Sequence, residues 1–582
     1  MICDVIEHFE AAWNELTADG AGFAIDEIEV RGNPMRVFAS ILPNMRSVWE
    51  IAALNGDKPY IVFEDERYTY AEIDAQVRAL AHLLRSEHGV GPGDRVAIAM
   101  RNYPEWVVAY WATIAIGAAA VGINAWWTSQ EMAFGLGDSS PKVLIADDER
   151  VSRVLPHLDE LRATRPLHLI TVRSDRPLPA GASRWTSVVD PSTAPAGLPD
   201  AQIDPDDDAT IFYTSGTTGS PKGAQLTHRG SVHNVMNMVF MAMAGAVAEA
   251  KAVAAGDQPA QPPFGERPPA QAIFMAPTPL FHVTANNCLL QPCTLTGGRI
   301  VFMYKWDAAR ALELIEREHV TNFSGVPTMS REMLLHPDWN TRDTSSLKAM
   351  GGGGAALQPD LVEKIDKSLK SGGPSTGYGL TETHGIVTAN SAKMYTEKPA
   401  SCGRVVPTLE ARLEDESGNV LEPGPNVLGE LSVRGATVIK GYLNRQKETA
   451  EGIRDGWFHT GDIARIDEDG FVFIVDRAKD MVIRGGENVY CSEVEAAIYE
   501  HPSVAEAAVF GVPDDRLGEI VAAAVVLRAG KPLSQLDLCD FLAQRIAKFK
   551  IPATVWFRTE QLPRNANGKF MKRELRKELT GI

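Results

Sequence analysis

The densest group of residues able to bind an anion follows a short apolar run, Ala209–Phe212. It reads Tyr213-Thr214-Ser215-Gly216-Thr217-Thr218-Gly219-Ser220-Pro221-Lys222-Gly223. Glycines allow close backbone approach, hydroxyl groups and amides can donate to phosphate oxygens, and Lys222 adds a positive charge. A flexible turn of the same composition is the alternative. We predict a polyphosphate-binding loop whose ligand-contacting residues are Thr214, Ser215, Gly216, Thr217, Thr218, Gly219 and Lys222.

This loop differs from the phosphate loop of the P-loop nucleotidases. That motif has a glycine before the lysine and a serine or threonine after it. Here Pro221 precedes Lys222, and Gly223 comes after it. The sequence therefore disfavours a P-loop nucleotidase.

Six further motifs rich in glycine and polar residues occur downstream in order. They are Pro279-Leu280-Phe281-His282, Gly351–Ala355, Gly377-Tyr378-Gly379-Leu380-Thr381-Glu382-Thr383, Trp457-Phe458-His459-Thr460-Gly461-Asp462, Asp476-Arg477-Ala478-Lys479-Asp480 and Leu562-Pro563-Arg564-Asn565-Ala566-Asn567-Gly568-Lys569. The ordered set resembles the adenylate-forming superfamily of acyl-CoA synthetases, peptide-synthetase adenylation domains and luciferases. The resemblance covers about residues 45–580.

The resemblance implies a two-step reaction that uses ATP, Mg²⁺ and CoA. A carboxylate first attacks the α-phosphorus of ATP, which gives an acyl-adenylate and pyrophosphate. The thiol of CoA then attacks the acyl-adenylate, which gives acyl-CoA and AMP. Because two anions must meet in the first step, the site has to neutralise negative charge.

By the same resemblance, the catalytic residues are Lys569, Thr381, Glu382 and His282. Glu382 would hold Mg²⁺ with the phosphate oxygens, and the Thr381 hydroxyl would bind the α-phosphate. Lys569 would bridge the carboxylate and the α-phosphate, a role that suits a compact charge. Taken singly, a solvated acid and a solvated lysine are the ordinary interpretations of Glu382 and Lys569.

The nucleotide itself is assigned to residues from three motifs. The resemblance implies that Tyr378 offers a flat face to adenine, Asp462 accepts the ribose hydroxyls, and Arg477 lies near ribose and phosphate. Without the motif context, Tyr378 would be interpreted as a core aromatic residue and Asp462 as a turn former. The remaining predicted nucleotide contacts are Gly353, Gly354, Ala355 and Gly379.

For the second step, the resemblance implies that a smaller C-terminal domain rotates about a hinge at Lys479. The rotation would remove Lys569 and bring Gly485-Gly486 beside the pantetheine arm of CoA. Glycines there would let a slender arm pass close to the backbone. A plain β-turn is the alternative for this dipeptide.

The residues directly after Phe281 constrain the acid. Amino-acid-activating relatives place an aspartate there, whereas this chain reads His282-Val283-Thr284, so an amino acid is disfavoured. The methionine-rich helix expected at His233–Val247 could line an acyl pocket, or could be ordinary core packing. The residues assigned to the acyl pocket are Met236, Phe240 and His282.

These observations favour a medium-chain, long-chain or ring-bearing apolar acid. An aryl-CoA ligase, or an enzyme that passes the acyl group to a carrier protein, stays open. A non-catalytic relative would be expected to lack Lys569, Glu382 or Asp462, and all three residues are present.

The elements that position these motifs indicate an α/β fold. Helical stretches such as Tyr70–Glu87 alternate with apolar runs such as Val96–Met100, which predicts βα units around two doubly wound sheets. Short alternating runs over residues 403–475 predict antiparallel strands of a small β-barrel. We therefore expect an N-terminal domain over residues 1–476 and a mobile α+β domain over residues 477–582.

Composition narrows the setting of the 582-residue chain. Its net charge of -18 argues against a nucleic-acid partner. Its six scattered cysteines suit a reduced cytoplasm, and the N-terminus carries no export signal. Trp106–Trp127 is uncharged but is typical of a buried helix and strand, so we expect no membrane span. Residues 244–272 are rich in alanine and proline, which predicts a surface insertion. Peripheral membrane contact and a homodimer both stay open.

Overall fold

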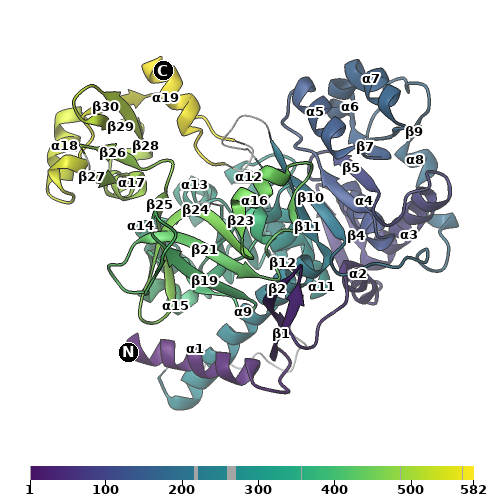
Figure 1. The fold of residues 1–582 in the computed structure, drawn as a ribbon, viewed down its shortest axis with the longest axis horizontal. Helices are drawn as coiled ribbons and strands as arrows, with labels where there is room; N and C mark the ends of the chain where they lie inside the picture. The colour runs from purple at the N-terminus through teal and green to yellow at the C-terminus, as the bar shows by residue number, and fades with distance from the viewer. Residues whose placement is uncertain are drawn as a thin grey trace.

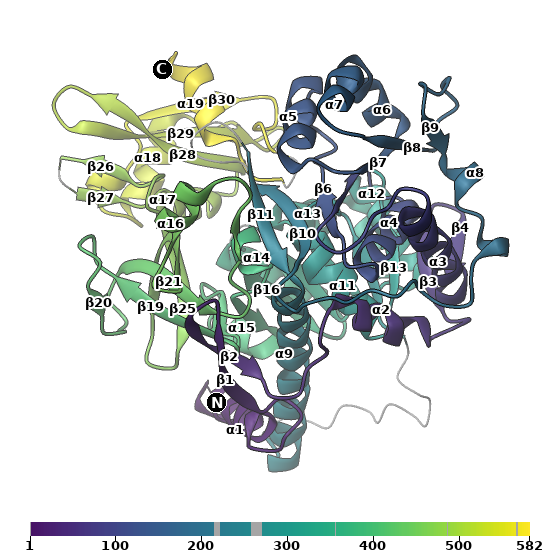
Figure 2. The ribbon, with the colours of Figure 1, turned by 45° about the vertical axis from the view of Figure 1, so that its right-hand side comes forward.

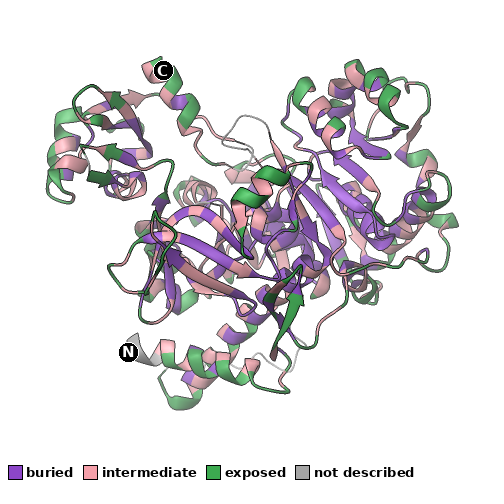
Figure 3. Ribbon diagram, viewed as in Figure 1, coloured by how far each residue is buried: buried purple, intermediate pink, exposed green. Residues whose placement is uncertain are grey.

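The computed structural model describes residues 2–214, 221–257, 271–354, 357–485, 487–565 and 568–581. Two large sheets with flanking helices form the N-terminal part, and a smaller sheet with three helices forms the C-terminal part (Figure 1). The α/β architecture with a large and a smaller part is the one predicted from the sequence. Buried residues concentrate in the strands, and exposed ones on the outer helices (Figure 3).

The first sheet has eight strands and a parallel core. Two antiparallel strands close one edge, because the chain turns back directly after β10. In spatial order the strands are β22 (Gly441–Tyr442), β11 (Lys222–Thr227), β10 (Asp208–Thr214), β6 (Ala119–Gly122), β5 (Arg95–Ala99), β7 (Val143–Asp147), β8 (His168–Val172) and β9 (Ala182–Arg184).

Helices cover both faces of this sheet, which explains its continuous apolar strands. Val96 and Ile98 face one core, shared with α2, α3 and α4, whereas Ala97 and Ala99 face another, shared with α5 and α6. The uncharged segment Trp106–Trp127 contains buried helix and strand, which confirms that prediction. The helices are α2 (Met45–Ala53), α3 (Tyr70–Ser86), α4 (Pro104–Ala115), α5 (Ser129–Ser139) and α6 (Asp148–Val154).

The second sheet is parallel in the middle and antiparallel towards its ends. Helices α12 (Ala308–Glu318), α13 (Pro327–Leu335) and α14 (Pro359–Ser368) share a core with one of its faces. Its strands are β20 (Val420–Leu421), β19 (Leu409–Glu414), β21 (Gly429–Gly435), β24 (Trp457–Ile466), β25 (Phe471–Arg477), β18 (Gly403–Val405), β17 (Thr388–Ser391), β16 (Gly373–Tyr378), β15 (Ala349–Gly353), β14 (Asn322–Gly325), β12 (Ile273–Ala276), β13 (Arg299–Phe302), β3 (Pro59–Phe63) and β4 (Glu66–Thr69), with β23 (Ile453–Arg454) beside β24.

The antiparallel strands predicted over residues 403–475 are present. Among the described strand pairs they continue the second sheet through β18, which pairs with both β17 and β25, and they form no separate closed ring. Gly403 allows this junction, because a Cβ atom there would lie 1.8 Å from the carbonyl oxygen of Ala389. The strand carrying Asp462 is therefore joined directly to the sheet carrying Tyr378.

The C-terminal part has its own sheet with a core on each face. Helices α17 (Cys491–Tyr499) and α18 (Gln535–Ala543) contribute to one core, and α19 (Lys572–Thr580) to the other. The strands are β27 (Glu487–Val489), β26 (Val482–Arg484), β29 (Gly518–Leu527), β28 (Val504–Asp514) and β30 (Thr554–Arg558). The domain boundary at residues 476/477 stays a prediction.

An N-terminal helix and hairpin pack against the long helix α9 (His228–Ala255), as Figure 2 shows. These elements are α1 (Ile2–Thr17), β1 (Ile25–Val30) and β2 (Asn33–Phe38). The predicted insertion over residues 244–272 is wrong for its first part, because residues 244–255 continue α9 and bury Ala244 and Ala252. Residues 258–270 of that segment lie outside the described residues.

Within the described residues, α9 has the length and apolar composition that could cross a membrane. Its first half is largely buried in the protein. The expected absence of a membrane span therefore stays a prediction.

Candidate active site

The ends of the predicted phosphate loop are held by a β-hairpin. Strands β10 and β11 pair in antiparallel register, with Thr214 opposite Lys222. The predicted loop contacts Ser215, Gly216, Thr217, Thr218 and Gly219 lie outside the described residues.

A tyrosine that the sequence analysis missed links this hairpin to the predicted metal ligand. The Tyr442 hydroxyl donates to Oε1 of Glu382 at 2.8 Å, and Nζ of Lys222 lies 5.2 Å from the centre of the Tyr442 ring. Burial and the Glu382 charge raise the pKa of Tyr442, so it stays a donor. Thr381, beside Glu382 in a short 3₁₀ helix, is buried. The tyrosine orients the carboxylate, and Oε2 of Glu382 accepts no hydrogen bond from the described residues.

The predicted adenine and ribose residues form one hydrogen-bonded group. The Tyr378 hydroxyl donates to Oδ2 of Asp462 at 2.6 Å, and Nε of Arg477 lies 3.1 Å from Oδ1. Asp462 and Arg477 face each other on β24 and β25. Asp462 is only 3% exposed. The structure thus brings together three residues that are up to 99 positions apart in sequence numbering, from Tyr378 to Arg477.

The glycine-rich strand β15 is shaped by close backbone contacts. A Cβ atom at Gly352 would lie 1.8 Å from the carbonyl oxygen of Gly325, and one at Gly379 would lie 1.6 Å from that of Gly385. At Gly353 the nearest contact would be the carbonyl oxygen of Gly377 at 2.9 Å. Strand packing therefore requires several of these glycines irrespective of any ligand. Gly354 has a φ of +86°, and a Cβ atom there would lie 3.9 Å from the Val326 side chain. Ala355 lies outside the described residues.

His282 begins the short helix α10 (Val283–Ala285) and is held in one tautomer. Its Nδ1 accepts from the backbone amide of Thr284 at 3.3 Å, which leaves Nε2 to carry the hydrogen. Burial and the nearby Lys569 charge lower the pKa of His282 to about 3. The residue is therefore a neutral donor at working pH, suited to a carboxylate oxygen.

Lys569 comes from the C-terminal part and lies near Arg477, Asp462 and Glu382 of the N-terminal site. Burial and the Arg477 charge lower its pKa, whereas Asp462 and Glu382 oppose that shift. Although protein groups surround its charge closely enough to lower the pKa, the residue as a whole is exposed. Its loop rests on the N-terminal part, since a Cβ atom at Gly568 would lie 2.8 Å from the Val326 side chain. Lys569 is thus close enough to Arg477, Asp462 and Glu382 for their charges to act on it, and its role in adenylation stays a prediction.

The predicted hinge and CoA residues lie elsewhere. Lys479 is exposed in a turn closed by hydrogen bonds from the amides of Asp480 and Met481 to the carbonyl oxygen of Arg477. Gly485 turns the hairpin between β26 and β27 with a φ of +61°, as the β-turn interpretation predicts. Gly486 lies outside the described residues. The assignment of this dipeptide to CoA binding stays a prediction.

The two α9 residues assigned to the acyl pocket have different surroundings. Met236 is partly buried beside the main core. Phe240 is fully buried against Trp13, Phe23 and Phe38, with ring centres 4.8, 5.3 and 6.5 Å away. Core packing against the N-terminal elements thus accounts for the burial of Phe240. Ordinary core packing was the alternative interpretation of the methionine-rich helix.

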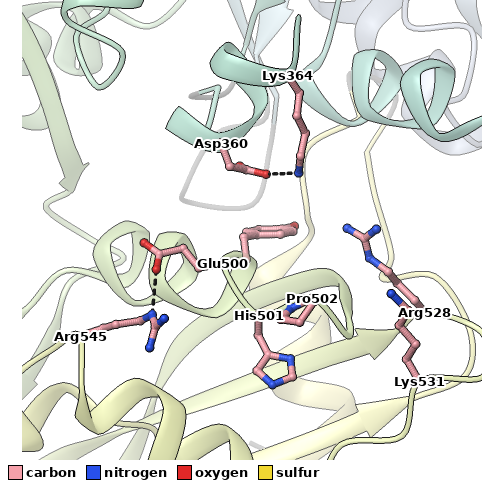
Figure 4. A pocket seen from close by; sticks show the side chains of 9 residues that line it. Asp360, Lys364, Glu500, His501, Pro502, Arg528, Lys531 and Arg545 are labelled. Atoms are coloured by element: carbon pink, nitrogen blue, oxygen red, sulfur yellow. Dashed lines mark hydrogen bonds and ion pairs between the residues drawn. The ribbon is translucent and has the colours of Figure 1, made fainter. Parts of the chain in front are cut away.

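The seam between the two parts contains a cavity of about 480 Å³, shown in Figure 4. It is lined by Lys364 and Asp360 of α14 and by residues that include Glu500 and Arg545 of the C-terminal part. None of its lining residues belongs to the predicted nucleotide group. Nearby, the Arg331 guanidinium pairs with Asp360 and lies 5.4 Å from the ring of Tyr499, which joins α13 to α17.

Comparison with known proteins agrees with this geometry. The family model of the AMP-binding enzyme matches residues 48–443, and that of the AMP-binding enzyme C-terminal domain matches residues 493–569. A feruloyl-CoA synthase of Amycolatopsis sp is 36% identical over 88% of this chain and 93% of that protein. A long-chain-fatty-acid–CoA ligase of Bacillus subtilis is 32% identical over 91% and 93%.

A solved structure of similar fold is the o-succinylbenzoate CoA synthetase of Bacillus subtilis in complex with its acyl-adenylate intermediate. It is 29% identical, has a TM-score of 0.73, and the match covers 92% of this chain and 98% of that one. The fold, the grouped site and these matches define an adenylate-forming enzyme. The chain belongs to the AMP-binding enzyme family, and its activity is that of an ATP-dependent, AMP-forming carboxylate–CoA ligase.

Proposed function

We propose that the enzyme activates a compact, ring-bearing acid, such as a 3-arylpropenoic acid, and transfers its acyl group to CoA. The observation that carries the proposal is the aromatic packing around Phe240, which fills the space beside α9 at that position. One helical turn beyond Met236, the helix face is filled by aromatic rings from the N-terminal elements. A long chain running along α9 would have to displace this buried cluster, at a cost of several kcal/mol, roughly that of losing a large core side chain.

Two further observations support an aromatic acid. The feruloyl-CoA synthase, named for an aromatic acyl product, is among the most similar relatives. Residues 282–284 offer no carboxylate to an ammonium group, which argues against amino acids. The roles of individual residues in the two steps belong to the same proposal.

In the first step, the carboxylate oxygen attacks the α-phosphorus, and pyrophosphate leaves. Lys569 neutralises the charge that develops between the two anions, while neutral His282 donates from Nε2 to the carboxylate. Asp462 and Arg477 hold the ribose. In the second step, the CoA thiolate attacks the acyl carbon, and AMP leaves.

Mg²⁺ fits the site through one protein carboxylate. Among the described residues no group of three acidic, histidine or cysteine side chains could hold a metal alone. Oε2 of Glu382 accepts no hydrogen bond within the described part of the chain, and Mg²⁺ is commonly bound by one or two carboxylates plus substrate phosphates. When bound, the ion would neutralise phosphate charge. A cytoplasmic location is also proposed, which the free thiols of Cys288, Cys293, Cys402, Cys491 and Cys539 support.

The test is pyrophosphate release across a panel of 3-arylpropenoic, fatty and α-amino acids, each with and without CoA. We expect the aryl acids to give the highest kcat/KM. Phe240→Ala should raise relative activity towards longer acids, whereas Met243→Ala, at an exposed position on the same helix, should not. A wild-type preference for long fatty acids would overturn the proposal.

A further inference from the structure

Lys572 occupies an unfavourable position for a positive charge. It is the first residue of α19, where the helix dipole opposes a cation. Its side chain is 22% exposed. A lysine held there needs compensation from nearby carboxylates.

Glu495 of α17 supplies that compensation. Its Oε1 lies 2.7 Å from Nζ of Lys572 and also accepts from the amide of Val509 on β28 at 2.8 Å. Glu495 is only 14% exposed, so the pair is well shielded from solvent. Burial opposes the charge of Lys572, but Glu495, Cys491 and Asp476 together outweigh it, and the pKa of Lys572 is raised.

The helix that carries Glu495 is tied across the predicted hinge to a second carboxylate, that of Asp476. Asp476 precedes Arg477, the last residue of β25, and its carboxylate accepts from the backbone amides of Arg477 and of Cys491 at the start of α17. Burial raises the pKa of Asp476 to about 6, and Lys572 is the largest influence in the opposite direction. Ser492 donates to the carbonyl oxygen of Val475, which adds a second tie between β25 and α17.

We propose that Lys572 is a positioning residue for adenylation: it fixes the segment that follows Lys569 to Glu495 and, through α17 and its hydrogen bond to Asp476, to the strand that carries Arg477. Lys572 lies three residues after Lys569. The β-bridge between Arg564 and Phe570 joins the chain on the two sides of Lys569. The network therefore links the two cations of the site through ordered contacts. The inference rests on the proposed role of Lys569.

The link to Asp476 exists only while α17 lies against β25. If the C-terminal part rotates about Lys479, the Lys572–Glu495 pair moves as a unit and Asp476 is left behind. Loss of Lys572 should therefore impair the first step, in which Lys569 acts, far more than the second.

The experiment compares Lys572→Met with Lys572→Arg and with Lys577→Met, an exposed lysine on the same helix. Pyrophosphate release is measured with whichever acid the wild type uses best, so failure of the aryl-acid proposal does not affect the result. Lys572→Met should lose about 10- to 100-fold in pyrophosphate release, the range expected for displacement of a catalytic group by about 1 Å. Conversion of supplied acyl-adenylate and CoA should stay within about twofold, and Lys572→Arg should recover most of the loss.

Equal losses in both half-reactions, or no loss in the first, would overturn the proposal. If Lys572→Met folds poorly, the double variant Glu495→Gln/Lys572→Met removes both charges of the pair. That variant should fold and still release pyrophosphate slowly. Normal pyrophosphate release by the double variant would also contradict the positioning role.

Discussion

The Tyr378 hydroxyl and the Asp462 carboxylate are 2.6 Å apart, so the predicted adenine platform and the predicted ribose ligand are one unit. Burial and the Asp462 charge hold the pKa of Tyr378 well above its usual value, which keeps it protonated as a donor. The carboxylate is thereby oriented before any nucleotide arrives.

Removing that hydrogen bond should weaken ATP binding without abolishing the stacking face. Tyr378→Phe should raise the KM for ATP about 5- to 30-fold, the equivalent of about 1–2 kcal/mol for a lost hydrogen bond to a charged group. Tyr68→Phe, which removes a similar bond to Glu66 away from the site, should leave the KM unchanged. An unaltered KM in Tyr378→Phe would argue against the linked unit.

Replacing Glu382 should chiefly affect the magnesium requirement. Glu382→Gln keeps an acceptor for Tyr442 but removes the charge, so half-maximal pyrophosphate release should need more Mg²⁺. Conversion of supplied acyl-adenylate should fall much less. Glu332→Gln, whose carboxylate accepts from Trp306, is the matched control. An equal loss of rate in both half-reactions would contradict the proposed role of Glu382 in binding Mg²⁺.

His282 should make the fold sensitive to acid. Its pKa in the folded chain is about 3, below the value of about 6.5 expected when unfolded. Below about pH 6.5 the unfolded state therefore binds more protons at this residue, and stability falls as pH drops towards 3. Between pH 7 and pH 5, the melting temperature of His282→Gln should fall less than that of the wild type. His82→Gln, at the surface, should behave like wild type.

Lys479→Pro should separate the two half-reactions. Proline fixes φ near about −65° and so should hinder rotation at the predicted hinge. We expect pyrophosphate release to persist and thioester formation to fall, with Lys479→Ala close to wild type in both. A selective loss of pyrophosphate release would contradict a hinge at this position.

Local patterns in the sequence predicted the elements that depend on local interactions. The apolar run at β5 and the uncharged segment holding α4 and β6 are examples, because burial on both faces demands continuous apolar residues. Most of the predicted nucleotide residues within the described part of the chain were assigned through motif order. Their grouping into hydrogen-bonded pairs depends on strand register, as for Asp462 and Arg477.

The contacts that the sequence could not predict depend on long-range packing. Tyr442 reaches Glu382 only because β22 pairs with β11, and nothing in its immediate sequence signals that contact. The role of Phe240 depends on rings from Trp13 and Phe23, more than 200 residues earlier. The alanine-rich start of the predicted insertion continues α9, since alanine favours helix and two of its alanines are buried.

The most direct test of the two-step account is Lys569→Ala, assayed separately for each half-reaction after its melting temperature is shown to match wild type. The account predicts that pyrophosphate release falls by about 10²- to 10³-fold, the cost expected for one lost charge-stabilising group. Supplied acyl-adenylate and CoA should still give thioester at close to the wild-type rate. Pyrophosphate release at the wild-type rate, or an equal loss of both half-reactions, would contradict it.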